Sequence, residues 1–371
     1  MDAVELLKAL IARPSVSGNE VEILGFVEKL LRDAAFDFVL AQKTFVAGRL
    51  DAAQGKGEKA IILTGHVDTV PAGDLTTWEA SPWEAQETTD RVIGLGASDM
   101  KAGVAGHLEV ALGVPRETLT RDLWVVVTAN EELDGQGSAD FADWYQAHTN
   151  YSEACAIISE PTDLETVRIG HRGNRFVRLT FRGGTGHASE QKHYASSALY
   201  QAVYFLSTID DIYDRLQVYT DKILGRPTFV PSSIVAGDPK APNKAAGQAE
   251  VIVDFRTVPK LEHVFDRVMS EIAEKYGFSW EYAVPYVDAT LTDEKADFIQ
   301  ELLTLSGAVI GVSRGSTDQG FYERVGIRTV VYGPGPSREA HQPNESVEKA
   351  ALWRFVQVER DWLKAMNVKA Q

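Results

Sequence analysis

A histidine and an aspartate stand two residues apart at the end of a short apolar segment. The segment comprises residues 61–63, and His66 and Asp68 follow a glycine. The branched apolar residues predict a buried strand, and residues two apart on a strand project from the same face. The Asp68 carboxylate can then accept a hydrogen bond from one ring nitrogen of His66 while the other binds a metal ion. Alone, such a pair is more often an ordinary loop contact, so the rest of the chain must decide.

More acidic residues and a second histidine follow other apolar segments. Residues 123–128 and 154–159 predict two further buried strands, and open α/β sheets bind ligands at the carboxyl ends of such strands. Imidazoles and carboxylates without thiolates suit Zn²⁺, Co²⁺ or Mn²⁺ in a hydrolytic site. If the acids converge, their mutual repulsion requires cations. Taken singly, each acid is more often a solvated surface residue. The candidate set is His66, Asp99, Glu131, Glu132, Glu160 and His341.

The elements that must position these residues change character twice along the chain. Residues 1–172 alternate apolar strands with helices, which predicts an α/β domain. Residues 173–284 contain strands with alternating apolar and polar residues, a long helical stretch over 194–216, and the order β-α-β-β-α-β. This order predicts an inserted two-layer domain of ferredoxin type. Residues 285–371 return to the α/β pattern.

Composition and charge exclude several classes of partner. The net charge of −16 argues against binding to nucleic acid or to anionic membranes. No apolar run reaches about 18 residues, and the first residues lack a secretory signal pattern, so we expect a cytoplasmic protein. The apolar surroundings of the single Cys155 predict a buried strand residue rather than a nucleophile. The glycines of segment 94–103 lack dinucleotide-binding spacing.

Five short motifs occur in order along nearly the whole chain and resemble the motif set of the M20 family of di-zinc metallopeptidases and deacylases. That family includes deacylases of acetylornithine, succinyl-diaminopimelate and acetyl-lysine. The resemblance implies a zinc-exopeptidase-like sheet flanked by helices, with residues 1–172 and 285–371 as the catalytic domain and 173–284 as a lid and dimerisation domain. The motifs are Gly65-His66-Val67-Asp68-Thr69-Val70-Pro71, Gly96-Ala97-Ser98-Asp99-Met100-Lys101, Asn130-Glu131-Glu132, Ser159-Glu160-Pro161 and His341-Gln342-Pro343-Asn344-Glu345.

The resemblance also implies a role for each strand-end residue. Two divalent ions, expected to be Zn²⁺ with Co²⁺ or Mn²⁺ as alternatives, would share Asp99 as a bridging ligand. One ion would be completed by His66 and Glu160, and the other by Glu132 and His341. Asp68 would orient His66, and Glu131 would be the general base for the water between the metals. The Asp99–Met100 peptide bond would be cis.

Five residues outside this set are implied to contact the substrate. His187 resembles the family's histidine that reaches a neighbouring active site in dimers and stabilises the oxyanion; an ordinary loop imidazole is the alternative. Asn243 and Arg256 fall where similar enzymes bind the substrate carboxylate, although Arg256 is equally explained as an exposed strand residue. Arg172 and Ser316 are further candidates of the same kind.

The sequence leaves the substrate open. Segments 190–198 and 243–246 depart from the family pattern, and both lie in the insertion. We expect a hydrolase that cleaves an amide bond of a small substrate with a free carboxylate, as in N-acyl amino acid deacylases of the ornithine, lysine or diaminopimelate type. A di-, amino- or carboxypeptidase using the same site is the alternative, and a non-catalytic metal-binding homologue is a remote one, against which Glu131 counts. A homodimer formed through the insertion is also expected.

Overall fold

The computed structural model describes residues 1–53, 57–190, 195–313 and 315–367. The chain divides into two compact units. The first comprises Met1–Gly170, Thr292–Val312 and Phe321–Gln371, and the second comprises His171–Leu291 and Ser313–Gly320.

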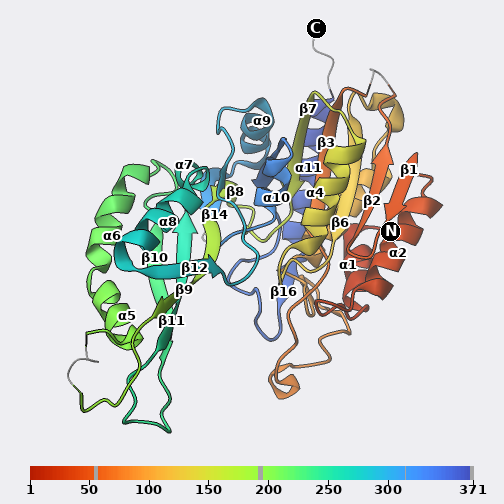
Figure 1. The fold of residues 1–371 in the computed structure, drawn as a ribbon. Coiled ribbons are helices and arrows are strands. Elements are labelled where there is room, and N and C mark those ends of the chain that lie inside the picture. The colour runs from red at the N-terminus through yellow and green to blue at the C-terminus, as the bar shows by residue number, and fades with distance from the viewer. Residues whose placement is uncertain (54–56, 191–194, 314, 368–371) are drawn as a thin grey trace. The chain divides into compact units, whose positions relative to one another are not determined.

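A mixed sheet of nine described strands has the order β1-β2-β6-β3-β7-β15-β8-β13, with β14 paired to β8 (Figure 1). Strands β6, β3, β7 and β15 run parallel, with Leu63 of β3 opposite Val125 and Ile157. Their carboxyl ends therefore meet at one edge, as the apolar segments predict. The strands are β1 Phe38–Ala41, β2 Phe45–Leu50, β3 Lys59–His66, β6 Asp122–Thr128, β7 Glu153–Ile158, β8 Thr166–His171, β13 Thr290–Leu291, β14 Val309–Ser313 and β15 Ile327–Val331.

Helices cover both faces of this sheet, which confirms the predicted α/β class. Helix α4 (Gln136–His148) lies in front of the sheet in Figure 1, and α11 (Lys349–Met366) lies behind it. Helix α3 (Lys101–Gly113) is apolar on nearly every side because it packs against α1 (Ala3–Ile11), α11 and the sheet. This part also contains a small sheet of β4 Gln86–Glu87, β5 Arg91–Ile93 and β16 Ser346–Glu348. Its other helical elements are α2 Val21–Asp33, α9 Asp297–Ser306, α10 Gln319–Arg324, η1 Leu75–Thr77 and η2 Arg116–Thr118.

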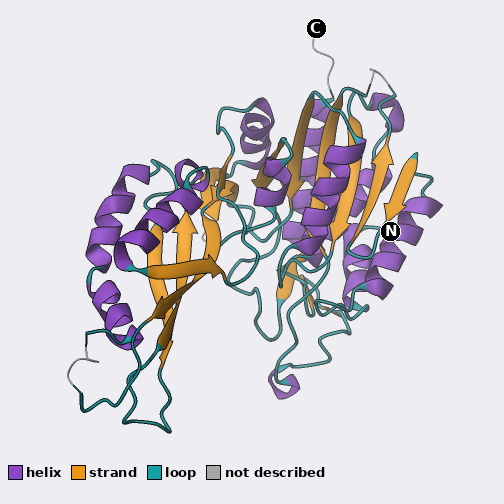
Figure 2. Cartoon of the chain, in the orientation of Figure 1, coloured by secondary structure: helices purple, strands orange, loops and turns teal. Residues whose placement is uncertain are grey.

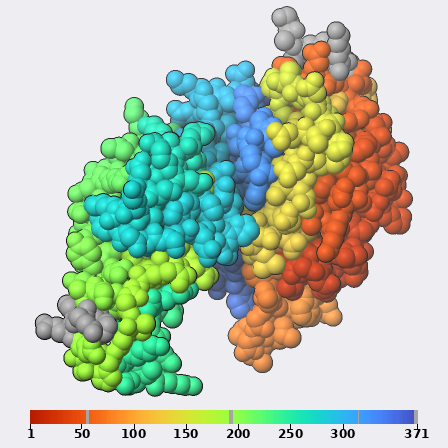
Figure 3. Space-filling view, in the orientation of Figure 1, coloured from red at the N-terminus to blue at the C-terminus, as the bar shows by residue number. Residues whose placement is uncertain are grey.

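The second unit contains a four-stranded antiparallel sheet with the order β10-β11-β9-β12. Its helices gather on one face of the strands (Figure 2), and the side chains of α8 form part of its outer surface, coloured teal in Figure 3. Its buried core includes Phe181, Phe205, Phe229 and Phe255. Its elements follow the predicted β-α-β-β-α-β order. Its elements are β9 Gly173–Arg182, α5 Ala198–Ser207, α6 Ile209–Leu216, η4 Gln217–Tyr219, β10 Thr228–Ala236, β11 Gln248–Thr257, α7 Pro259–Glu262, α8 Phe265–Tyr276 and β12 Phe278–Tyr282.

The helical stretch expected over 194–216 is not one helix. Residue 194 lies outside the described residues, residues 195–197 precede the first helix, and the rest forms α5 and α6 with a break at Thr208. The hydroxyl of Ser207 donates to the carbonyl of Tyr204, and that of Thr208 donates to the carbonyl of Phe205. Such side-chain hydrogen bonds compete with the helix ladder and end the first helix.

None of the described helices combines the length and the apolar character needed to cross a membrane.

Candidate metal centre

His66 occupies the last position of β3, where its backbone is packed closely. A Cβ on Gly65 would lie 2.5 Å from the Met100 methyl carbon and 2.9 Å from Cγ2 of Val104, so these side chains would have to shift to admit a larger residue. The His66 Nδ1 atom lies 3.1 Å from the main-chain oxygen of Asp68. Because a carbonyl oxygen only accepts, Nδ1 carries a proton, and in the neutral form of the ring the lone pair that can bind a cation lies on Nε2.

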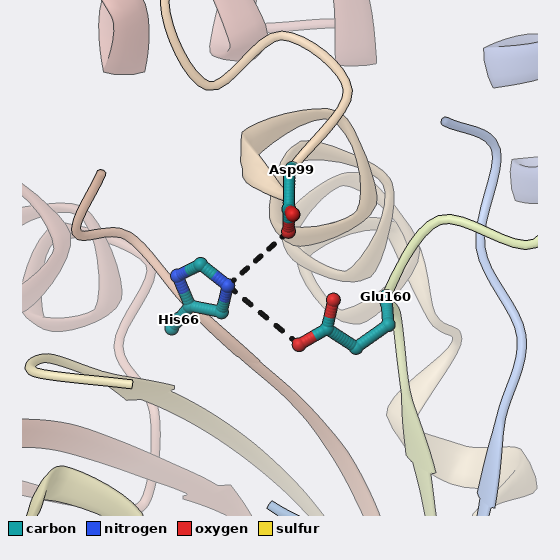
Figure 4. A group of neighbouring side chains, drawn as sticks. All are labelled: His66, Asp99 and Glu160. Atoms are coloured by element: carbon teal, nitrogen blue, oxygen red, sulfur yellow. Dashed lines mark ion pairs between the residues drawn. The ribbon is translucent and has the colours of Figure 1, made fainter. Parts of the chain in front are cut away.

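The Nε2 atom of His66 faces two carboxylates (Figure 4). It lies 3.4 Å from Oδ1 of Asp99 and 3.6 Å from Oε1 of Glu160. Nε2 of His66 and Oδ1 of Asp99 are both buried and have no hydrogen-bond partner within the described part of the chain. Buried polar atoms without a partner are costly, and one nitrogen with two carboxylate oxygens is a set that fits a divalent cation. The Asp99–Met100 peptide bond is cis, as the resemblance implies.

A second group of ligand atoms shares Asp99 with the first. Nε2 of His341 lies 2.9 Å from Oε1 of Glu132 and 3.6 Å from Oδ2 of Asp99. In each group the three ligand atoms lie within 4.8 Å of one another. The two groups differ in exposure, because the His341 side chain is 49% exposed and that of His66 is 1% exposed. Asp99 thus offers one oxygen to each of two candidate cation positions.

Asp68 holds the loop that carries the two adjacent glutamates. Its fully buried carboxylate accepts the Ser17 hydroxyl at 2.7 Å and the main-chain N–H groups of Glu131 and Glu132 at 3.1 and 3.2 Å. The expected contact from this carboxylate to His66 is longer, at 3.4 Å, than the contact made by the main chain of Asp68. The side chain of Glu131 approaches the same centre, with Oε2 at 3.9 Å from His66 Nε2.

Crowding of the carboxylates shifts the pKa of the surrounding groups. Burial lowers the pKa of His66, but the neighbouring Asp68 and Asp99 outweigh it and raise that pKa well above 6.5. Burial raises the pKa of Asp99, but His66 and His341 lower it overall. The pKa of Glu132 is raised, chiefly by burial. The anionic centre therefore strongly favours positive charge beside it, as expected for a cation site.

Glu345 closes the last motif, and the sequence pattern alone does not predict a role for it. Its carboxylate is 2% exposed and accepts three backbone N–H groups of the loop that ends at Asp99. Burial raises the pKa of Glu345 to about 8, against these donors. The signal in the sequence is its place at the end of the motif His341-Gln342-Pro343-Asn344-Glu345.

The proposed substrate-binding residues lie in the second unit and have local partners there. The Arg256 guanidinium pairs with both carboxylate oxygens of Asp254, at 2.8 and 3.1 Å. Arg172 donates to the main-chain oxygen of Arg226 at 3.4 Å. The two remaining residues are Asn243, whose carbonyl accepts the N–H of Ala188 at 2.8 Å, and Ser316, whose Oγ lies 3.5 Å from Nδ2 of Asn174.

His187 is exposed in a loop of the second unit. Its Nδ1 atom lies 2.7 Å from the Ser189 hydroxyl and 3.3 Å from the Ser189 backbone nitrogen. Because a backbone N–H only donates, Nδ1 is the acceptor and the ring proton lies on Nε2. The neutral ring therefore presents an Nε2–H donor.

Comparison with known proteins identifies the family to which this chain belongs. A family model described as peptidase family M20/M25/M40 matches residues 62–365. The acetylornithine deacetylase of Klebsiella pneumoniae (strain 342) is 27% identical over 376 residues, covering 96% of this chain and 95% of that protein. The chain therefore belongs to the M20/M25/M40 peptidase family, and it is a hydrolase.

Solved structures show the same fold. An M20 family metallo-carboxypeptidase from Sulfolobus solfataricus superposes with a TM-score of 0.77 at 18% identity, over 100% of both chains. A dinuclear metal binding peptidase of the M20 family from Bacillus subtilis gives a TM-score of 0.71 at 16% identity, over 98% of this chain and 97% of that one.

Proposed function

We propose that this enzyme hydrolyses the amide bond of a small N-acyl amino acid with a free carboxylate, of the ornithine, lysine or diaminopimelate type. The observation that carries the proposal is the position of Asp99, which offers one oxygen to each of two ligand groups with Glu131 beside them. The relationship to an acetylornithine deacetylase over nearly the whole chain supports the deacylase reading.

Two divalent cations, most simply Zn²⁺, fit the ligand groups. His66, Asp99 and Glu160 would hold one, and Asp99, Glu132 and His341 the other. When bound, such ions would lower the pKa of a water molecule and would offset the charge that develops on the substrate carbonyl oxygen. Co²⁺ and Mn²⁺ prefer similar donor atoms.

The remaining steps belong to the side chains of the protein. Glu131 accepts a proton from the attacking water and returns it to the leaving nitrogen. The Asp68 carboxylate keeps Glu131 in place by accepting the backbone N–H of Glu131. The main-chain oxygen of Asp68 accepts a hydrogen bond from the His66 ring and so keeps the His66 lone pair directed at the cation. Nε2–H of His187, supplied by a second copy of the chain, donates to the developing oxyanion.

Recognition of the substrate carboxylate is assigned to Arg172, Asn243, Arg256 and Ser316. An arginine can bind a carboxylate through two parallel hydrogen bonds. Arg256 already holds Asp254 in this way, so a substrate carboxylate must compete with that side chain. The cytoplasmic location expected from the sequence stays a prediction.

Glu131→Gln tests the proposal directly. This variant should retain about two metal ions per chain by elemental analysis, because Glu131 is not among the proposed ligands. Its kcat should fall by roughly 10²- to 10⁴-fold, since a general base contributes about that much. Unchanged kcat, or wild-type protein that binds no divalent metal, would refute the mechanism.

A peptidase using the same centre is the second candidate, favoured by the structural likeness to a metallo-carboxypeptidase. A panel of N-acetyl and N-succinyl basic amino acids, assayed beside dipeptides at equal concentration, separates the two. The deacylase proposal requires higher kcat/KM on the acylated amino acids, and the reverse order would replace it with the peptidase.

A further inference from the structure

The buried carboxylate of Glu345 holds one loop by three hydrogen bonds. Oε2 accepts the N–H of Gly96 at 2.8 Å, and Oε1 accepts the N–H groups of Ser98 and Asp99 at 2.7 and 2.6 Å. All three of these partners are donors, so the two acceptor oxygens of the Glu345 side chain satisfy them at once.

The backbone of Glu345 is fixed from the same side. Its carbonyl accepts the N–H of Gly94 at 2.9 Å. The next residue, Ser346, begins β16 and pairs with Ile93 of β5. The backbone of Glu345 is therefore held at the start of β16 by hydrogen bonds to β5 and to Gly94. A side chain on such a fixed backbone can restrict the motion of loop 96–99, which it binds.

Glu345 lies between two proposed ligands. It contacts Asp99, the residue common to both ligand groups, directly at the backbone nitrogen. It also follows His341, which stands at a positive φ of 61°, by four residues. One side chain thereby connects the backbone of the bridging carboxylate to the loop that supplies the exposed imidazole.

We propose that Glu345 is a positioning residue for the two-cation site, which sets the distance between Asp99 and His341 before any cation binds. This inference rests on the proposed function, because it presumes that these residues are ligands. Groups that orient metal ligands typically change metal affinity by roughly 10- to 100-fold when they are removed.

Glu345→Gln is the direct test, because the amide keeps the size of the side chain but turns an NH₂ group toward N–H donors. Metal-free wild type and variant are titrated with Zn²⁺ in competition with a chromophoric chelator. Glu345→Gln should raise the dissociation constants by roughly 10- to 100-fold. Glu345→Asp, which is one methylene shorter, should give an intermediate value and serves if the glutamine variant does not fold.

Glu359→Gln is the matched control. Glu359 is also a fully buried glutamate of the first unit, but it pairs with His107 rather than with a proposed ligand. The control should lose thermal stability while keeping wild-type affinity for Zn²⁺. Wild-type affinity in both Glu345 variants, or equal weakening in Glu359→Gln, would overturn the inference. Failure of the wild type itself to bind Zn²⁺ would instead overturn the proposed function.

Discussion

Single hydrogen bonds decide which ring nitrogen carries the proton in His66 and His187. The carbonyl of Asp68 requires Nδ1–H in His66, and the backbone N–H of Ser189 requires an unprotonated Nδ1 in His187. The two histidines therefore present opposite groups at Nε2, a lone pair in one and a donor in the other. The first suits a metal ligand and the second suits the stabilisation of an oxyanion.

Ser189→Ala should weaken the preference of His187 for the Nε2–H form. The variant loses the 2.7 Å contact of the hydroxyl, which is worth about 1 kcal/mol, or about fivefold in rate. We expect kcat to fall by about this factor with KM little changed. Ser189→Thr, which retains the hydroxyl, is the control. Equal kcat in wild type and Ser189→Ala would show that the hydroxyl has no such role.

The burial of His171 should make the free energy of unfolding depend on pH. Burial lowers the pKa of this histidine to about 4, whereas the unfolded chain has an ordinary value of about 6.5. Between these values the unfolded state binds more protons, so the free energy of unfolding falls as the pH falls, by up to about 1.4 kcal/mol per pH unit.

Urea unfolding of His171→Gln at pH 4.5, 5.5 and 6.5 tests this account, because the variant should lack that part of the slope. His148→Gln, which removes an exposed imidazole, controls for the loss of one histidine. The assignment fails if His171→Gln and wild type share the same pH slope.

At the scale of elements, a close contact between a buried histidine and a buried glutamate joins the helix that follows Asp99 to the last helix of the chain. Nδ1 of His107 in α3 lies 2.8 Å from Oε1 of Glu359 in α11, and both side chains are at most 1% exposed. Breaking a buried pair leaves one polar group uncompensated, whereas replacing both with apolar residues removes that cost.

His107→Leu should therefore reduce the free energy of unfolding by about 3–5 kcal/mol, and the double variant His107→Leu/Glu359→Leu should recover most of the loss. Chemical denaturation of the two single variants, the double variant and wild type completes the cycle. Additive losses in the double variant would mean that the two side chains do not depend on each other.

The elements that the sequence predicts best are those buried on both faces. Strands β3, β6 and β7 are continuous apolar runs, so pattern alone identifies them. Strand β14 was not predicted; it has five residues, and its first two, Val309 and Ile310, are exposed. The break between α5 and α6 depends on two hydroxyl groups, which a helical pattern cannot register.

At the scale of the whole molecule, the sequence identifies which residues stand at strand ends but not how their atoms pair. The shared use of Asp99 arises only when distant loops fold against one another, as the contact of His341 with Glu132, 209 residues earlier, shows. Glu345 was overlooked for the same reason, because its partners are backbone groups 246 to 249 residues earlier.

Assembly into a homodimer remains a prediction. Strand β10 is an edge of its sheet and exposes Val230, Ile234 and Val235, and α5 exposes Val203. Unprotected apolar edges favour pairing with another chain.

Val235→Lys should convert a dimer into a monomer in light scattering coupled to gel filtration. Val218→Lys changes an equally exposed valine in η4 and should leave the mass unchanged. A monomeric wild type would remove both the dimer and the proposed role of His187 in a neighbouring site.

The unequal exposure of His66 and His341 has a consequence for metal exchange. A cation at His66 would sit behind buried atoms, whereas one at His341 would border solvent. We therefore expect a fast-exchanging outer ion and a slow-exchanging inner one. Brief treatment with a chelator should yield a form with one ion, and refilling it with Co²⁺ should produce a mixed-metal enzyme with a distinct visible spectrum. Loss of both ions at one rate would show that the two positions are equally labile.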